Sequence, residues 1–335
     1  MKFLSLLALI LVAVISVGRT AHAYPEFISY SYTTCITCHY NPQGNGPLND
    51  YGRALFSAEI AARDIFPEKM SDEDIAAGSG FLGSTKLPTW LRPGYSYRGL
   101  WFQQNPGSAG TVKRWITMQN EFNTVIQFDA DQKYVFVGSI EDVQLSTSST
   151  GYPNDAWISR EHYLRWQFKD TMWLSVGMME KVFGIRIIDH TAYAIQNLNL
   201  DSHTSVLGTL THAATWYWSE PNRDVAVQLF VGNLNEHEAS PPSDSQVRQR
   251  GGSIMTEFNT GENSRTGGSY LMSSNSATQM QRLAAHQRMG ISHGSALLAE
   301  LGVMQNQDII GSTGVKTGLF GFVQSTVLLR RGYNL

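Results

Sequence analysis

The chain has only two cysteines, Cys35 and Cys38, among its 335 residues. A structural zinc site takes four ligands, and no second cysteine pair or further nearby histidine supplies them. The sequence also has no obvious βαβ pattern, which disfavours a thioredoxin-like redox pair. A disulfide between the two cysteines stays open as an alternative, because exported proteins commonly pair their cysteines.

The chain also lacks an excess of positive charge and any late apolar run of spanning length. Its net charge is -3, which excludes a strongly basic nucleic-acid-binding protein. No transmembrane helix is visible after the first 23 residues. We find no low-complexity tract, no phosphate-binding loop and no Ser-His-Asp order. The question of enzyme activity therefore stays open.

Residues 1–23 have the features of a secretory signal peptide. Lys2 gives the positive charge, Phe3 to Val17 is an apolar run, and Ala21-His22-Ala23 is a small-x-small cleavage site. The run is short for a membrane span, which disfavours the alternative of an uncleaved anchor. Removing Lys2 and Arg19 takes the basic residues from 25 to 23 against 28 acidic residues, so the mature charge is -5.

Both cysteines fall in the motif Cys35-Ile36-Thr37-Cys38-His39, which has the spacing of a c-type haem attachment site. Each thiol can add to one haem vinyl group, and the imidazole of His39 then lies beneath the iron as proximal ligand. The predicted signal peptide and the motif support each other, because bacterial haem c is attached after export. The sequence thus predicts one covalent haem c.

Residues 24–85 are expected to form a small α-helical haem c module. Helical spacing predicts a helix from about Leu48 to Ile65, and Ser71 begins a second one. Met70 is a candidate distal iron ligand, since its thioether would raise the haem potential. The barrel-region histidines or an open site are the alternatives. Tyr51 and Arg53 are candidates for binding a haem propionate.

Residues 86–335 alternate with a period of two, so we expect a mainly β fold. The clearest segments are Trp115 to Phe128, Thr171 to Met178 and Val225 to Gly232. Long strands and alternating short turns and long loops predict an antiparallel transmembrane β-barrel of about 12 strands. A soluble β-sandwich is the rival. The polar sequence after Val315 to Arg330 predicts that the barrel is left incompletely closed.

Several residues of the β region are candidates for particular positions. Tyr217 and several tryptophans near strand ends are expected in aromatic girdles. Asp189 and His190 form a weak candidate metal site. The histidines that could reach a haem in the lumen are His162, His190, His203, His212, His237, His286 and His293.

The chain resembles outer-membrane cytochrome–porin fusions, including the iron-oxidising ones. The resemblance rests on the signal peptide, the Cys35–His39 motif, the segment Leu48-Asn49-Asp50-Tyr51-Gly52-Arg53 and the barrel pattern. It implies a haem plug in a barrel that passes single electrons across the outer membrane. It also implies Cys35 and Cys38 as thioether sites and His39 as axial ligand.

The first hypothesis is therefore an outer-membrane monohaem cytochrome with a porin-like barrel. Its partners would be periplasmic electron carriers and an external electron donor or acceptor. The alternatives are a periplasmic haem-binding β-rich protein, such as a sensor or small-molecule enzyme, and a porin with a structural haem.

Overall fold

The fold was analysed in a computed structural model of the whole chain. It describes residues 25–44, 46–60, 69–81, 87–104, 111–144, 155–185, 210–234, 248–309, 314–330 and 333–334. The predicted signal peptide lies outside these residues, as do Asp189, His190, His203 and His237.

Twelve long strands form one antiparallel sheet, which confirms the predicted mainly β fold and the strand number. The strands are β1 (Leu91–Gln104), β2 (Val112–Gln127), β3 (Tyr134–Gln144), β4 (Asp155–Lys169), β5 (Met172–Glu180), β6 (Leu210–Glu220), β7 (Arg223–Phe230), β8 (Arg250–Gly261), β9 (Ser264–Ser274), β10 (Thr278–Ser292), β11 (Ser295–Asp308) and β12 (Val315–Thr326). A separate hairpin pairs β13 (Leu328–Arg330) with β14 (Tyr333–Asn334).

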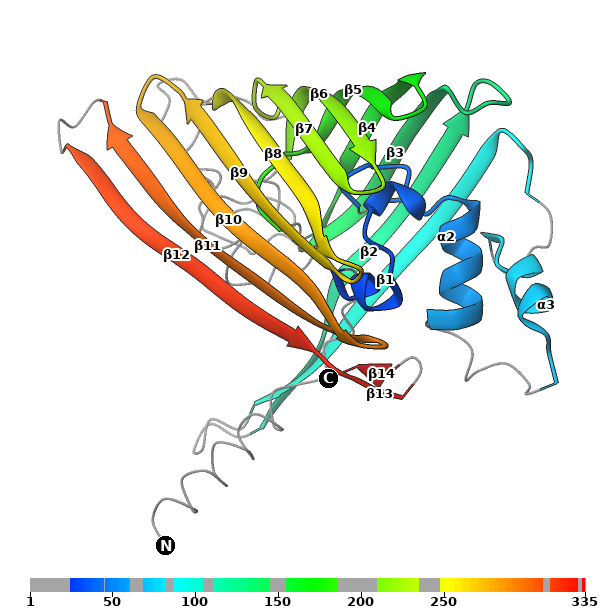
Figure 1. Cartoon of the computed structure of the whole chain (residues 1–335). Coiled ribbons are helices and arrows are strands. Elements are labelled where there is room, and N and C mark those ends of the chain that lie inside the picture. Colours follow the sequence, from blue (N-terminus) through cyan, green and yellow to red (C-terminus); the bar gives the residue numbers. More distant parts are fainter. Residues whose placement is uncertain are drawn as a thin grey trace, which may run out of the picture.

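Each strand pairs with the next along the chain, and the sheet curves around a central space (Figure 1). In the described part of the chain, β1 and β12 are the two edges and no pairing joins them. The sheet is thus unclosed, as the C-terminal sequence predicted. The connections after β2, β4, β6, β8 and β10 are short and lie at one end of the sheet, which we call the short-turn end.

The helices are short. The α-helices are α2 (Asp50–Leu55) and α3 (Asp72–Ala77), and α2 runs on into a wider π-helical turn, Phe56–Ile60. The start of α3 was predicted correctly, because the Ser71 side chain caps it by accepting the Asp74 N–H at 3.1 Å. The helix predicted from about Leu48 to Ile65 begins at Asp50, and residues 61–65 of that range lie outside the described residues. No helix in the described ranges is long and apolar enough to cross a membrane.

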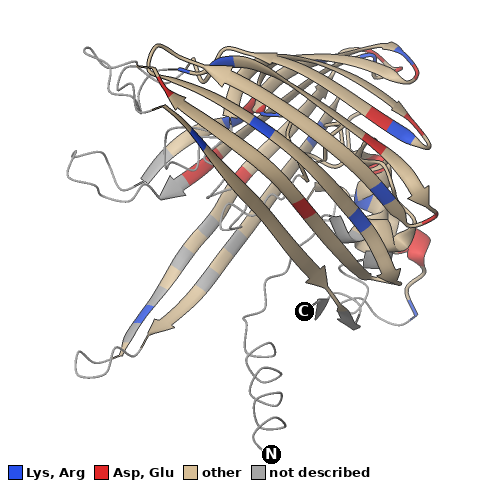
Figure 2. Cartoon of the chain, turned by 60° about the vertical axis from the view of Figure 1, so that its left-hand side comes forward, with Lys and Arg blue, Asp and Glu red and all other residues tan. Residues whose placement is uncertain are grey.

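The polarity of the strands is inverted relative to a water-soluble sheet. Side chains on the outward face are large and apolar, with exposed fractions of 77% for Leu319, 67% for Leu301 and 66% for Leu229. The inward face carries many polar or charged side chains beside buried apolar ones, and Arg265 and Arg282 are almost fully buried there. Figure 2 shows that charged residues occupy only a small part of the strands. An outward apolar face of this extent needs an apolar environment.

Residues 25–44, which we call the N-terminal segment, lie inside the curve of the sheet (Figure 1). The Tyr40 hydroxyl accepts a hydrogen bond from Gln127 of β2 at 2.7 Å, and the Tyr40 carbonyl accepts one from Arg165 of β4 at 2.7 Å. Tyr40 also belongs to a buried apolar cluster with strand residues such as Val125. The segments predicted as haem module and barrel therefore share one interior.

The chain also enters the interior after β5. Residues 181–185 are all buried, and their backbone N–H groups are held by side chains of three distant strands. Val182 donates to Gln228 of β7 at 3.0 Å, and Gly184 donates to Ser269 of β9 at 2.9 Å. This inward segment and the N-terminal segment together fill much of the space inside the sheet.

Candidate cofactor site

The Cys35–His39 motif forms one tight turn inside the sheet. Residues Cys35–Thr37 make a 3-10 turn, and the carbonyl of Cys35 accepts the N–H groups of Cys38 at 3.1 Å and His39 at 3.0 Å. His39 then pairs with Leu48 in an isolated antiparallel bridge. The turn brings both thiols and the imidazole to one side of the loop, where all three line the same cavity.

Asn49 holds this turn against helix α2. Its side-chain oxygen accepts the Gly52 N–H at 2.8 Å, and its amide donates to the Thr37 carbonyl at 3.0 Å. Its backbone N–H donates to the Cys38 carbonyl at 2.8 Å. Gly52 is required here, because an added Cβ would lie 2.4 Å from the Cys38 carbonyl oxygen. Asn49 thus joins the helix start to the motif.

We expect Asn49→Ala to lower the free energy of unfolding by about 1 to 2 kcal/mol, since it removes the helix cap and the bond to the motif. Asn49→Ser should recover part of this loss, because serine can cap the helix but cannot donate an amide N–H to Thr37 in the same way. Urea unfolding of the purified variants measures both. Equal stability of all three proteins would show that Asn49 does not hold the turn.

Arginines from the opposite wall fix the other side of the motif. The Thr33 carbonyl accepts hydrogen bonds from Arg265 of β9 at 2.7 Å and from Arg288 of β10 at 3.3 Å. Arg265 is itself paired with Asp224 of β7 at 2.6 Å, and Arg288 is paired with Glu257 of β8 at 2.5 Å. These pairs offset the cost of burying the guanidinium groups.

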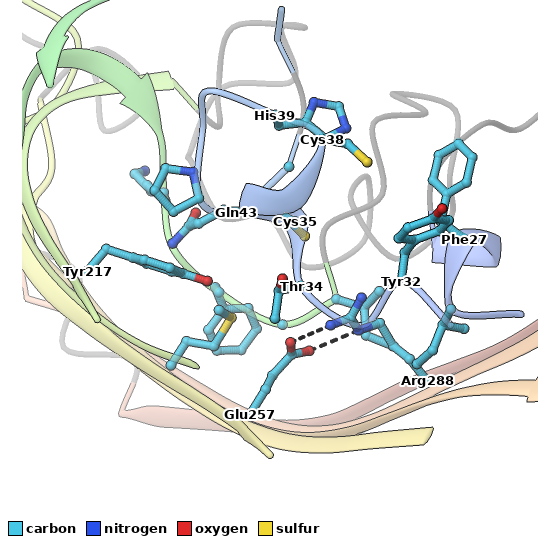
Figure 3. Close-up of a pocket in the computed structure, with 18 residues that line it drawn as sticks. Phe27, Tyr32, Thr34, Cys35, Cys38, His39, Gln43, Tyr217, Glu257 and Arg288 are labelled. Atoms are coloured by element: carbon cyan, nitrogen blue, oxygen red, sulfur yellow. Dashed lines mark hydrogen bonds and ion pairs between the residues drawn. The ribbon is translucent and has the colours of Figure 1, made fainter. Parts of the chain in front are cut away.

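The cavity beside the motif encloses about 910 Å³ of empty space, part of it open to solvent (Figure 3). Its apolar lining includes Phe27, Phe183 and Met255, and its charged lining is Lys181, Glu257 and Arg288.

The cavity lies in the half of the sheet nearer the short turns. Tyr217, Glu257 and Arg288 line it, and each falls within four residues of the end of its strand at that side. The motif, the strand walls and the inward segment after β5 all contribute to it. A flat, largely apolar cofactor with a few polar groups suits such a lining.

The two cysteines are free thiols, and their surroundings suit thioether formation better than metal binding. Burial raises the pKa of Cys35. Burial, and secondly the neighbouring Cys35, raise the pKa of Cys38 to about 11. Within the described ranges, no group of three or more His, Cys, Asp and Glu side chains is arranged to hold a metal ion.

Addition of a thiol to a haem vinyl group would give a neutral thioether, so the product would bury no negative charge. The sulfur–hydrogen bond of each thiol breaks, a carbon–sulfur bond forms, and the hydrogen goes to the other vinyl carbon as the double bond is lost. No oxidant or reductant enters this balance. The residues present therefore fit a covalent haem c, with His39 at the proximal position of the motif.

Other predicted site residues lie elsewhere. The residues that line the cavity do not include Met70, which precedes α3, nor any of His162, His212, His286 and His293. Arg53 donates to the carbonyls of Leu48 and Pro93, so it tethers α2 to β1 and does not reach the cavity. The Tyr51 hydroxyl is bonded to that of Tyr32 at 2.9 Å, and Tyr51 is exposed.

Met70 does not line the cavity, so the structure gives an expectation that differs from the predicted distal ligation by Met70. Met255 is the methionine among the cavity-lining residues. We therefore expect the near-infrared band of a methionine–iron bond, if the oxidised protein has one, to survive Met70→Ala. Absorption spectroscopy of the purified protein and variant measures this. Loss of the band in Met70→Ala alone would establish Met70 as the ligand.

Several cavity residues escaped the sequence reasoning. Tyr217 was expected in an outward aromatic girdle, but its position on β6 turns it inward, where it is 3% exposed. That expectation was wrong because adjacent residues of a strand face opposite sides. The signal was present: Thr215, Tyr217 and Ser219 alternate with Trp216 and Trp218, so Tyr217 shares the polar face.

The sequence matches no family model and no curated protein. Among solved structures, it is similar to an anion-selective porin from Comamonas acidovorans, at 10% identity and a TM-score of 0.47, over 71% of this chain and 74% of that chain. It is also similar to the outer membrane channel DcaP of Acinetobacter baumannii, at 11% identity and a TM-score of 0.46, over 74% and 75% of the two chains. OmpT of Vibrio cholerae aligns at 8% identity and a TM-score of 0.40, over 72% and 92%. These TM-scores are too low to assign a function.

Proposed function

We propose that this chain is an outer-membrane β-barrel protein that holds one haem c in its interior and passes single electrons between the periplasm and the outside. The observation that carries the proposal is the placement of Cys35, Cys38 and His39. All three line one cavity inside a sheet whose outward face is apolar.

The membrane location is supported by the polarity of the strands. A sheet with Leu229, Leu301 and Leu319 facing outward would aggregate in water, whereas lipid makes the same face favourable. The strands are 8 to 16 residues long, and most reach the length that a tilted membrane strand needs. In outer-membrane barrels the short turns face the periplasm. The cavity would then lie in the periplasmic half.

The residues of the chain have separate roles in this proposal. Cys35 and Cys38 attach the cofactor, His39 binds its iron from the proximal side, and the apolar lining keeps bulk water away from it. Arg265 and Arg288 hold the motif against the wall through the Thr33 carbonyl. When bound, the haem iron supplies reversible one-electron oxidation and reduction.

Electron transfer is favoured over diffusion of solutes by the filling of the interior. The N-terminal segment joins β2 and β4 to β9 and β10, and the inward segment after β5 crosses to β7 and β9. Two segments that fill the interior in this way oppose an open pore. A porin with a structural haem is the second candidate, and a soluble periplasmic haem protein is the third.

Purified protein in liposomes tests the proposal. We expect electrons to pass from an enclosed donor to an external acceptor with the wild-type protein and not with the Cys35→Ala, Cys38→Ala double variant. Solute uptake by the same vesicles distinguishes the second candidate, because a porin would admit small sugars at equal rates with either protein. Recovery of the protein in the soluble periplasmic fraction of cells would contradict the membrane location.

A further inference from the structure

A buried histidine lies directly behind the cavity wall. The Nε2 atom of His286 on β10 is 2.8 Å from the Oε1 atom of Glu257 on β8, and the His286 side chain is fully buried. Glu257 lines the cavity beside the motif. Its other contacts are with Arg288, at 3.1 Å from Nε to Oε1 and 2.5 Å from Nη2 to Oε2.

One nitrogen of this imidazole is left without a partner. The hydrogen bond to the Glu257 carboxylate places a proton on Nε2, so Nδ1 carries a lone pair whenever the ring is neutral. Nδ1 is buried and makes no hydrogen bond. The site has room for the imidazole because Gly267 of β9 faces it, where an added Cβ would lie 2.3 Å from Nε2. A buried nitrogen without a hydrogen bond costs free energy, so its presence in a folded protein calls for an explanation.

Several ionisable side chains surround His286. The negative groups are Asp224 of β7, Glu257 of β8 and Glu300 of β11, and Glu300 is the direct cross-strand neighbour of His286. The positive groups are Arg265 of β9 and Arg288 of β10. Three carboxyl groups and two guanidinium groups therefore surround this part of the wall. The remaining charged residue of the cavity, Lys181, lies over the Phe230 ring at 5.4 Å.

We propose that His286 is a proton-binding site coupled to the redox state of the haem, so that this protein takes up a proton when it takes up an electron. The inference rests on the proposed function. One electron from a one-electron donor lowers the charge of the iron by one. One proton from solvent binds His286 at Nδ1, and the sum of charges in the interior is unchanged.

The coupling is electrostatic and short in range. Arg288 contacts both Glu257 and the Thr33 carbonyl, two residues before Cys35, so the cluster and the cofactor site share one wall. Charges interact strongly in such a buried region, because solvent screens them little. Loss of one positive charge at the iron therefore favours gain of one at His286. Histidine is suited to this role because it ordinarily changes charge between about pH 5 and 8.

Potentiometric titration of the purified haem-bearing protein tests the proposal. At a fixed applied potential, we expect the ratio of oxidised to reduced haem to rise with pH, by up to about tenfold per pH unit for one proton per electron. His286→Gln keeps an amide donor for Glu257 but cannot take the proton, so its ratio should be nearly independent of pH. His293→Gln is the matched control, since His293 lies in the next turn and stacks on Tyr30 instead.

A second variant tests the same inference if His286→Gln does not fold. Glu300→Gln removes one negative charge from the cluster and should move the pH-dependent range to lower pH. Haem-bearing wild-type protein with a pH-independent ratio would overturn this inference and leave the proposed function standing. The same pH dependence in wild type and His286→Gln would also overturn it. Wild-type protein without covalent haem would overturn the proposed function and this inference together.

Discussion

Replacement of Cys35 and Cys38 together by alanine is expected to abolish covalent haem in this protein. Both thiols line the cavity, are free, and are buried enough that neutral sulfur is favoured. Thioether bonds survive denaturation, so haem staining on a denaturing gel reports attachment directly. The wild-type band should stain and the double variant should not.

Controls within the same turn separate attachment from folding. Thr37→Ala removes only a hydroxyl that is bonded to Thr34 at 2.8 Å, so its staining should match that of the wild type. Either single cysteine variant should keep one thioether and stain more weakly. Staining that persists in the double variant would refute the haem assignment, and both cysteines would then need another role.

Arginine at Leu301 is expected to disrupt assembly of the sheet in the membrane. Leu301 lies midway along β11 and is 67% exposed on the outward face. Arginine at the middle of a membrane barrel strand costs about 2 to 4 kcal/mol, because its charge must leave water. Urea unfolding in vesicles and heat-modifiable migration on gels both measure the loss.

The matched control is Gln305→Arg, four residues along the same strand and on the same face. Gln305 lies toward the end of β11, where a membrane interface would place charge at a cost of only about 0 to 1 kcal/mol. A stability loss in Leu301→Arg that greatly exceeds the loss in Gln305→Arg supports an outward face in lipid. Equal losses would indicate that β11 does not cross a bilayer.

Local sequence was enough to predict many elements of this fold. The capped start of α3, the alternation along β2 and the short connections between hairpins all depend on neighbours a few residues apart. The helix after the motif begins later than predicted, since apolar spacing alone does not show that Asn49 caps it. Tyr217 was misplaced because aromatic residues near strand ends suit either face.

The sequence by itself determined the haem attachment motif, the period of two and the number of strands, because each is written in residue types at short, regular spacing. The tertiary structure alone decided that the motif lies inside the sheet and that Arg265, Arg288 and Glu257 surround it. These residues are separated from Thr33 and Cys35 by more than 200 positions, and strand register brings them together. Register depends on the pairing of all twelve strands and on the side of the sheet that each residue faces, which no local pattern specifies.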